Sequence, residues 1–199
     1  PDILLHFSVP FALSVPIFGI KRSLIIGLVA ILPDLDVLLH IHRSMTHSLI
    51  ILSTLSLPIL LTIALQRPNE LQYTIACILA LFSHPIFDAF QTYTPILYPL
   101  MQRSLYFSVN SNIIVGSEIT PKIHVQVHTI STTFTPFTKL EGPLFTSETL
   151  PITLSLIIIP ILYSLYLKIN KNKRSSSCLL YTSDAADDGE SVDLGGRRI

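Results

Sequence analysis

Three long apolar stretches without a basic residue constrain this chain more than any other feature. They cover Ser48–Gln66, Leu71–Phe90 and Leu150–Leu167. Each approaches the roughly 20 mostly apolar residues that a membrane-spanning helix needs. Only 13% of the 199 residues are charged, against about 25% in ordinary soluble domains, and the mean hydropathy is +0.58. The sequence therefore predicts a membrane protein rather than a soluble domain.

Two weaker apolar stretches raise the predicted number of spanning helices to about five. Ile3–Ile20 contains prolines, and Ser23–Ile41 reaches two aspartates. The basic loops then set the orientation, because Lys and Arg in short loops favour the cytoplasm. The last stretch is followed by Lys168, Lys171, Lys173 and Arg174, which place the C-terminus in the cytoplasm. With five helices, every short cytoplasmic loop contains a basic residue.

The long segment 91–149 separates the fourth and fifth predicted helices and is polar enough to lie outside the bilayer. Within it, Ile123–His128 alternates apolar and polar residues, which predicts a strand. The fold expected is thus an all-α membrane protein with a small β-rich extramembrane segment. We expect one membrane-embedded domain over residues 1–174, with this segment packed as a lid over the helix ends.

The end of the chain differs in composition from the rest. Cys178–Asp188 resembles the translation of a transposon-end adapter used in sequencing libraries. We expect 175–199 to be a disordered tail, and exclude it from 178 onward as read-through. The net charge of the whole chain is zero, with 13 basic and 13 acidic residues, but these charges are unevenly distributed along the chain, so the total alone excludes no class of partner. No nucleic-acid partner is expected. Cys77 and Cys178 fit neither a disulfide framework nor a zinc ribbon.

Ionisable residues at membrane depth are costly and indicate function. In the predicted topology they gather at the outer, extracytoplasmic end of the helices. Only Lys and Arg set that topology, so the convergence is an independent observation. The residues are His6, Asp34, Asp36, His42, His47, His84 and Asp88.

Imidazole and carboxylate groups are the usual ligands of zinc and related divalent ions. His84 and Asp88 are four residues apart, which puts them on one face of a helix. Asp34 and Asp36 follow Pro33, and an extended turn there would point their carboxylates in opposite directions. One would bind the metal, and the other would orient a histidine or bind a second ion. The sequence predicts a divalent metal site, with zinc as the first expectation.

Three motifs carry a family resemblance. LPDLD at residues 32–36, HRSMTHS at 42–48 and SHPIFDAFQTYTPILYP at 83–99 resemble the YdjM-like family, also called LexA-binding, inner-membrane-associated hydrolases. The resemblance spans residues 6–99 and implies a metal-dependent hydrolase in the inner or plasma membrane. Ser44 stands where the family usually has glycine, and residues 91–95 depart from its Thr-Pro-x-Gly stretch.

A more distant resemblance is to zinc-dependent phospholipase C and related zinc nucleases. It implies the metal ligands His6, Asp34, His42 or His47, His84 and Asp88. Those enzymes also use a later histidine and glutamate. Glu118, His124 and His128 are available for that role, although their spacing does not match.

The predicted function is hydrolysis of a phosphoester or other ester at the membrane surface by a metal-activated water. Asp36 or Asp34, whichever does not bind metal, would be the general base. Arg43 would stabilise developing negative charge. The expected partners are the lipid bilayer and a small-molecule or lipid substrate. The alternative is a membrane protein that binds or transports metal without catalysis.

Overall fold

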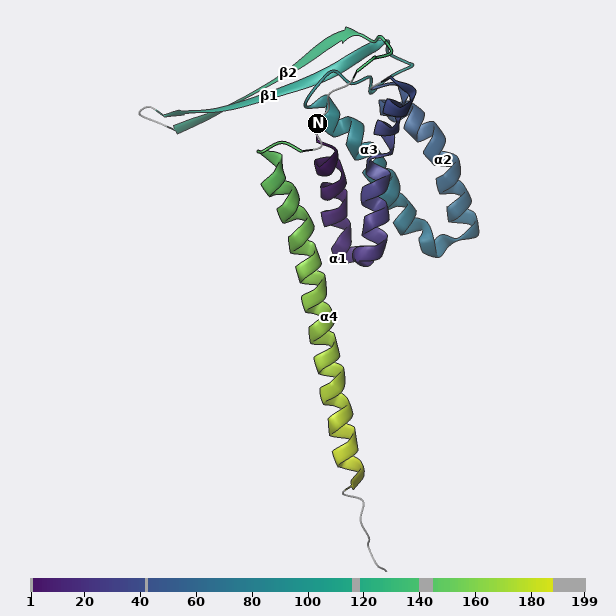
Figure 1. The fold of residues 1–199 in the computed structure, drawn as a ribbon, viewed down its shortest axis with the longest axis vertical. Helices are drawn as coiled ribbons and strands as arrows, with labels where there is room; N and C mark the ends of the chain where they lie inside the picture. The colour runs from purple at the N-terminus through teal and green to yellow at the C-terminus, as the bar shows by residue number, and fades with distance from the viewer. Residues whose placement is uncertain (1, 42, 116–118, 140–144, 188–199) are drawn as a thin grey trace, which may run out of the picture.

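The structure is a helical bundle with a long β-hairpin at one end (Figure 1). The computed structural model describes residues 2–41, 43–115, 119–139 and 145–187, with backbone alone beyond residue 170. Its helices are α1 (Ile3–Ala30), α2 (Leu49–Gln66), α3 (Leu71–Ala89) and α4 (Thr149–Asp187), with 3-10 helices η1 (Leu32–Leu39), η2 (Met45–His47) and η3 (Pro68–Glu70). Strands β1 (Arg103–Val115) and β2 (Ile119–Ser131) follow α3. The predicted mainly helical fold with a small β-rich segment before the last helix is confirmed.

Four helices in the described part of the chain are long and apolar enough to cross a membrane. They are Ile3–Ala30, Leu49–Gln66, Pro68–Ala89 and Thr149–Asn170. The sequence predicted about five, and the difference lies in the first two stretches. The structure joins most of them into α1 and then continues as η1, so Ser23–Ile41 is not a spanning helix of its own.

Helix α1 bends sharply at Gly19, whose φ of 74° and ψ of 168° are not helical. Only glycine reaches this conformation without a steric penalty. The second arm folds back along the first (Figure 1), and a Cβ on Gly27 would lie 2.6 Å from the Phe7 ring. This second arm, residues 20–30, rises only about 16 Å, which is less than the hydrocarbon thickness of about 30 Å.

The bundle has a small core and a wide apolar surface. Helix α1 packs against α3 and α4, and α2 packs against α3. Ile26, Ala30 and Ala80 form the buried centre. Large apolar side chains on the helices are exposed, including Leu65 on α2 and Ile159 on α4. Such surfaces suit lipid, which needs no polar face.

The hairpin of β1 and β2 is antiparallel, with Val109 opposite Val125. Its base is attached to the bundle, since Thr94 and Leu105 exchange backbone hydrogen bonds of 2.9 Å. Most of its length is exposed and extends beyond the helix ends (Figure 1). The predicted strand at Ile123–His128 is therefore present, but only the base of the hairpin packs on the helices.

Helix α4 begins beside the N-terminus and runs past the far end of the bundle (Figure 1). At its start, the carboxylate of Asp2 accepts hydrogen bonds from Thr146 and Thr149. The helix continues to Asp187, so residues 175–187 are helical where disorder was expected. These residues contain no glycine or proline that would end a helix. The rest of the predicted tail, 188–199, lies outside the described residues.

Candidate metal centre

Four separate elements bring their polar side chains together at the hairpin end of the bundle. His6 comes from the first turn of α1, and His84 and Asp88 come from the last turns of α3. Asp34 lies on η1 and His47 on η2, between the helices. All of these side chains are buried except that of Asp34, which is 12% exposed. The structure thus places five of the six predicted metal ligands in one cluster.

The sixth predicted ligand, His42, lies outside the described residues. Glu118 lies outside them too. His124 and His128 are on β2, away from the cluster, and the His128 ring stacks on Tyr106 with ring centroids 5.6 Å apart. Neither belongs to the groups of possible metal ligands found among the described residues.

The segment of Asp34 and Asp36 is a 3-10 helix, and the predicted extended turn is wrong. Pro33 occupies the first turn of η1, where a missing N–H costs nothing. With three residues per turn, side chains two apart point in different directions. Asp34 therefore faces His84 while Asp36 faces the back of His47. Asp36 thus lies where it can orient a histidine, and metal binding by Asp34 stays a prediction.

The donor atoms of Asp34, His47 and His84 lie close enough together to be ligands of one ion, and Asp88 lies beside them. Asp34 Oδ1 lies 3.2 Å from His84 Nε2 and 3.5 Å from His47 Nε2. Asp88 Oδ2 lies 3.5 Å from His47 Nε2 and 4.0 Å from His84 Nε2. Atoms held at 2.0–2.2 Å by one tetrahedral zinc are separated by about 3.3 Å. Asp34 lies near that distance from both histidines, whereas Asp88 is farther from His84.

His6 extends the cluster on the other side of Asp88. Its Nε2 lies 3.1 Å from Asp88 Oδ1, and its ring stacks on His84 with centroids 4.0 Å apart. His6, His84 and Asp88 form one possible ligand group, and Asp34, His47 and His84 form another. Because the two groups share His84, and the Asp88 carboxylate contacts both His6 and His47, the cluster has room for one ion or for a close pair.

Asp36 supports His47 from behind. Its Oδ2 accepts hydrogen bonds from the Ser44 N–H at 2.7 Å and the Thr46 hydroxyl at 3.1 Å. The same oxygen lies 3.4 Å from His47 Nδ1. A carboxylate on the outer nitrogen is the usual partner of a metal-binding histidine, because it fixes the ring and the tautomer. The sequence did not single out Ser44 and Thr46 for this support.

The charge balance of the cluster favours a cation. Burial opposes the charged form of His47, yet the neighbouring carboxylates of Asp34 and Asp36 raise its pKa to about 9. Burial acts against the Asp34 carboxylate as well, but His47 and His84 hold its pKa well below the usual value. The carboxylates of Asp34, Asp36 and Asp88 thus all lie beside one buried imidazole. Buried charges are normally paired or bound to metal.

Several polar atoms in the cluster lack a hydrogen bond. Among the described residues, His84 Nδ1 and Nε2, His6 Nδ1, and one oxygen each of Asp34 and Asp88 have no hydrogen-bond partner. Leaving buried polar atoms unsatisfied costs about 1–3 kcal/mol each. A metal ion would satisfy those that face the centre, so the donor set fits a divalent ion.

Arg43 lies at the edge of the cluster, with its Nε 3.4 Å from Asp88 Oδ2 and its side chain 22% exposed. Its backbone φ is 55°, a conformation that is uncommon outside glycine and often marks functional sites. The next residue is Ser44, whose hydroxyl accepts a hydrogen bond from the Thr46 N–H and caps η2. Ser48 caps α2, since its hydroxyl accepts a hydrogen bond from the Ile51 N–H.

Comparison with known proteins identifies the family. The chain matches the model of the YdjM inner membrane protein family over residues 6–173. The chain belongs to this family. No curated protein and no solved structure matches it. The YdjM match and the four apolar helices together establish a membrane protein. The match includes every residue of the cluster and ends before the adapter-like residues from 178.

Proposed function

We propose that this YdjM family member is a membrane-bound metal-dependent hydrolase that acts on phosphoesters at the membrane surface. The observation that carries the proposal is the pair of possible ligand groups at one end of the spanning helices, which share His84. They are Asp34, His47 and His84, and His6, His84 and Asp88. When bound in such a site, a divalent ion, with zinc first, lowers the pKa of a water toward 7 and polarises a phosphoryl or acyl oxygen.

The protein residues divide the remaining tasks. The Asp34 side chain is partly exposed, so we assign it as a metal ligand on the side of the site from which water enters. Asp36 Oδ2 accepts hydrogen bonds from the Ser44 N–H and the Thr46 hydroxyl. These bonds favour an orienting role for Asp36 over that of general base. Arg43 stands at the rim and would hold the non-bridging oxygens of a phosphoryl group as negative charge develops.

The structure supports placing this site on the extracytoplasmic side. Arg22 pairs with Glu70 at the opposite end of the bundle from the cluster, and Arg67 ends α2 there. Helix α4 starts near the cluster, where the Thr149 hydroxyl donates to the Asp2 carboxylate. The helix then runs toward the opposite end, and its basic residues lie in its later turns. Short basic loops favour the cytoplasm. The cluster would then face the outer surface, and the C-terminus the cytoplasm.

A non-enzymatic metal transporter is the alternative. Transport sites generally lie near the midplane of the bilayer, on broken helices. Here the candidate ligands lie at helix ends and on two 3-10 helices that connect them. This position favours chemistry at the membrane surface.

The test uses the full chain purified in detergent and returned to lipid vesicles. Phosphate or phosphoester release from a glycerophospholipid should require the metal, stop with a chelator and return when zinc is added. His84→Ala should lose both metal and activity, while His128→Ala should keep both. Activity in metal-free protein would contradict the proposal, and zinc uptake into the vesicles without hydrolysis would favour the transport alternative.

A further inference from the structure

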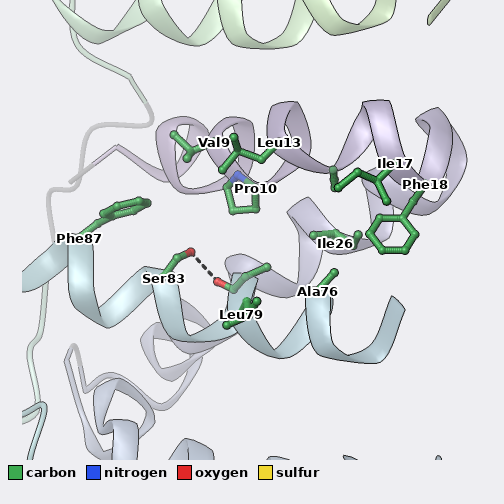
Figure 2. Close-up of a pocket in the computed structure, with 12 residues that line it drawn as sticks. Val9, Pro10, Leu13, Ile17, Phe18, Ile26, Ala76, Leu79, Ser83 and Phe87 are labelled. Carbon is green, nitrogen blue, oxygen red and sulfur yellow. Dashed lines mark hydrogen bonds between the residues drawn. The ribbon is translucent and has the colours of Figure 1, made fainter. Parts of the chain in front are cut away.

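An apolar groove runs along the bundle between α1 and α3 (Figure 2). Its volume is about 250 Å³. Val9, Leu13 and Ile17 line it from the first arm of α1, Ile26 from the second, and Leu79 and Phe87 from α3. An engineered apolar cavity of about 150 Å³ stays dry and binds benzene, so this groove is large enough for hydrocarbon.

The walls of the groove offer no free hydroxyl group. Ser14 donates to the Phe11 carbonyl at 3.0 Å, and Ser83 donates to the Ala80 carbonyl at 2.7 Å (Figure 2). Both hydroxyls are therefore bound to their own helix. The remaining lining residues have apolar side chains, so the groove is suited to an alkyl chain and not to a polar ligand.

The end of the groove at Phe87 lies next to the candidate metal centre. The Phe87 ring, which lines the groove, lies 6.1 Å from the ring of His6 between centroids. Ser83 directly precedes His84, and Pro10 is one helical turn from His6. A molecule with its chain in the groove would thus have its polar end beside the cluster.

The length of the groove matches one leaflet. From Ala76 to Phe87 the α3 wall rises about 16 Å, which is about half of the 30 Å hydrocarbon thickness. The groove lies wholly within spanning segments, and Leu13 and Leu79 are 72% and 62% exposed at its rim. A chain from the surrounding lipid can enter sideways.

We infer that this groove binds one acyl chain of a glycerophospholipid and so places its phosphoester at the cluster. The inference rests on the proposed function for the reaction at the headgroup, but chain binding itself does not require catalysis. It assigns the substrate class to long-chain lipids of the leaflet on the side of the cluster.

The experiment uses the full chain in vesicles that contain a phosphatidylglycerol with a photoreactive diazirine in the middle of one acyl chain. After illumination, mass spectrometry locates the crosslinks. Label should concentrate on the lining residues of α1 and α3, at least about fivefold above α2. Ala76→Phe should fill the groove and remove this excess.

Ala64→Phe on α2 is the matched control, since it adds the same ring to a spanning helix outside the groove. Leu13→Trp is a second blocking variant at an exposed position, in case Ala76→Phe does not fold. Crosslinks spread evenly over all helices, or equal labelling of Ala76→Phe and Ala64→Phe, would overturn the inference.

Hydrolysis provides a separate arm. If the protein hydrolyses lipids, Ala76→Phe should raise KM for a long-chain phospholipid about tenfold and leave a short, water-soluble phosphodiester unaffected. If crosslinks concentrate in the groove but no phosphoester is hydrolysed, the proposed function fails while the acyl-chain site stands. If hydrolysis occurs with equal KM in both variants, the groove is not the substrate site.

Discussion

His47 connects the two acidic parts of the site. Its Nε2 faces Asp34 and Asp88, at 3.5 Å each, while its Nδ1 faces Asp36 at 3.4 Å. A histidine held in this way presents one nitrogen to a metal and keeps the other bound to the protein. The adjacent Thr46 hydroxyl donates to Asp36 or to the Pro33 carbonyl, which joins η2 to η1.

The first prediction separates the two neighbouring aspartates. Asp36→Asn should weaken metal binding about 10- to 100-fold without abolishing it, because only the support of His47 is lost. Metal titration of the purified protein measures this. Asp2→Asn is the control, since Asp2 is a buried carboxylate at the same end of the bundle but outside the cluster. Unchanged affinity in Asp36→Asn together with lost hydrolysis would instead restore the general-base role.

The second prediction concerns Arg43. Arg43→Gln should lower kcat for phosphoester hydrolysis about 100-fold or more, because a positive charge near the reacting group is lost. Its metal content should stay unchanged, since arginine is not a ligand. Arg103→Gln, at the base of β1, is the matched control and should have full activity. Loss of metal in Arg43→Gln would show that this residue holds the site together.

Much of the site could be predicted from residue type and spacing. His84 and Asp88 share one face of α3 whichever way the helix crosses the membrane. The distribution of Lys and Arg in the loops alone predicted that the polar residues gather at one end of the helices. The support of Asp36 by Ser44 and Thr46 could not be predicted, because it depends on a loop conformation with Arg43 at positive φ. Sequence periodicity does not reveal such loops.

At the level of elements, α1 decides how the site is assembled. Its bend at Gly19 returns the chain to the hairpin end, where η1 delivers Asp34 beside His6 of the first turn. The sequence predicts two apolar stretches here. It does not predict that they fold back on each other, because the bend depends on the backbone conformation of one residue. Apolar periodicity is weak in lipid-facing helices, so the groove between α1 and α3 was also not predictable.

The third prediction tests the bend. Gly19→Ala should destabilise the protein by about 1–3 kcal/mol, because alanine at a φ of 74° is strained even where space is open. A lower melting temperature in detergent, followed by intrinsic tyrosine fluorescence, would show this. Ser53→Ala on the exposed face of α2 is the control. An unchanged melting temperature in Gly19→Ala would mean that α1 does not need this bend.

For the whole molecule, the polar chemistry and the short basic loops lie at opposite ends of the bundle. Asp88 and its neighbours are near the hairpin, and Arg22 with Glu70 is at the other end. This separation is what the distribution of Lys and Arg predicted without reference to the site. The number of passes was less predictable, because α1 has the length of a span and yet folds back.

The fourth prediction is the orientation in the membrane. In a chain whose cysteines are replaced by serine, Thr133→Cys near the base of the hairpin should react with a membrane-impermeant maleimide added to intact cells. Asn69→Cys in η3, at the opposite end, should react only after the cells are opened. The reverse labelling pattern would place the cluster in the cytoplasm.

The central claim is that this cluster holds a divalent metal ion, and metal analysis of the purified protein tests it most directly. Elemental analysis should find one or two divalent ions per chain, with zinc first, in the parent protein and in His128→Ala. His84→Ala and Asp34→Ala should retain less than about one tenth of that content while remaining monodisperse. A parent protein without stoichiometric metal after zinc reconstitution, or a metal content that is equal in all four proteins, would contradict the account.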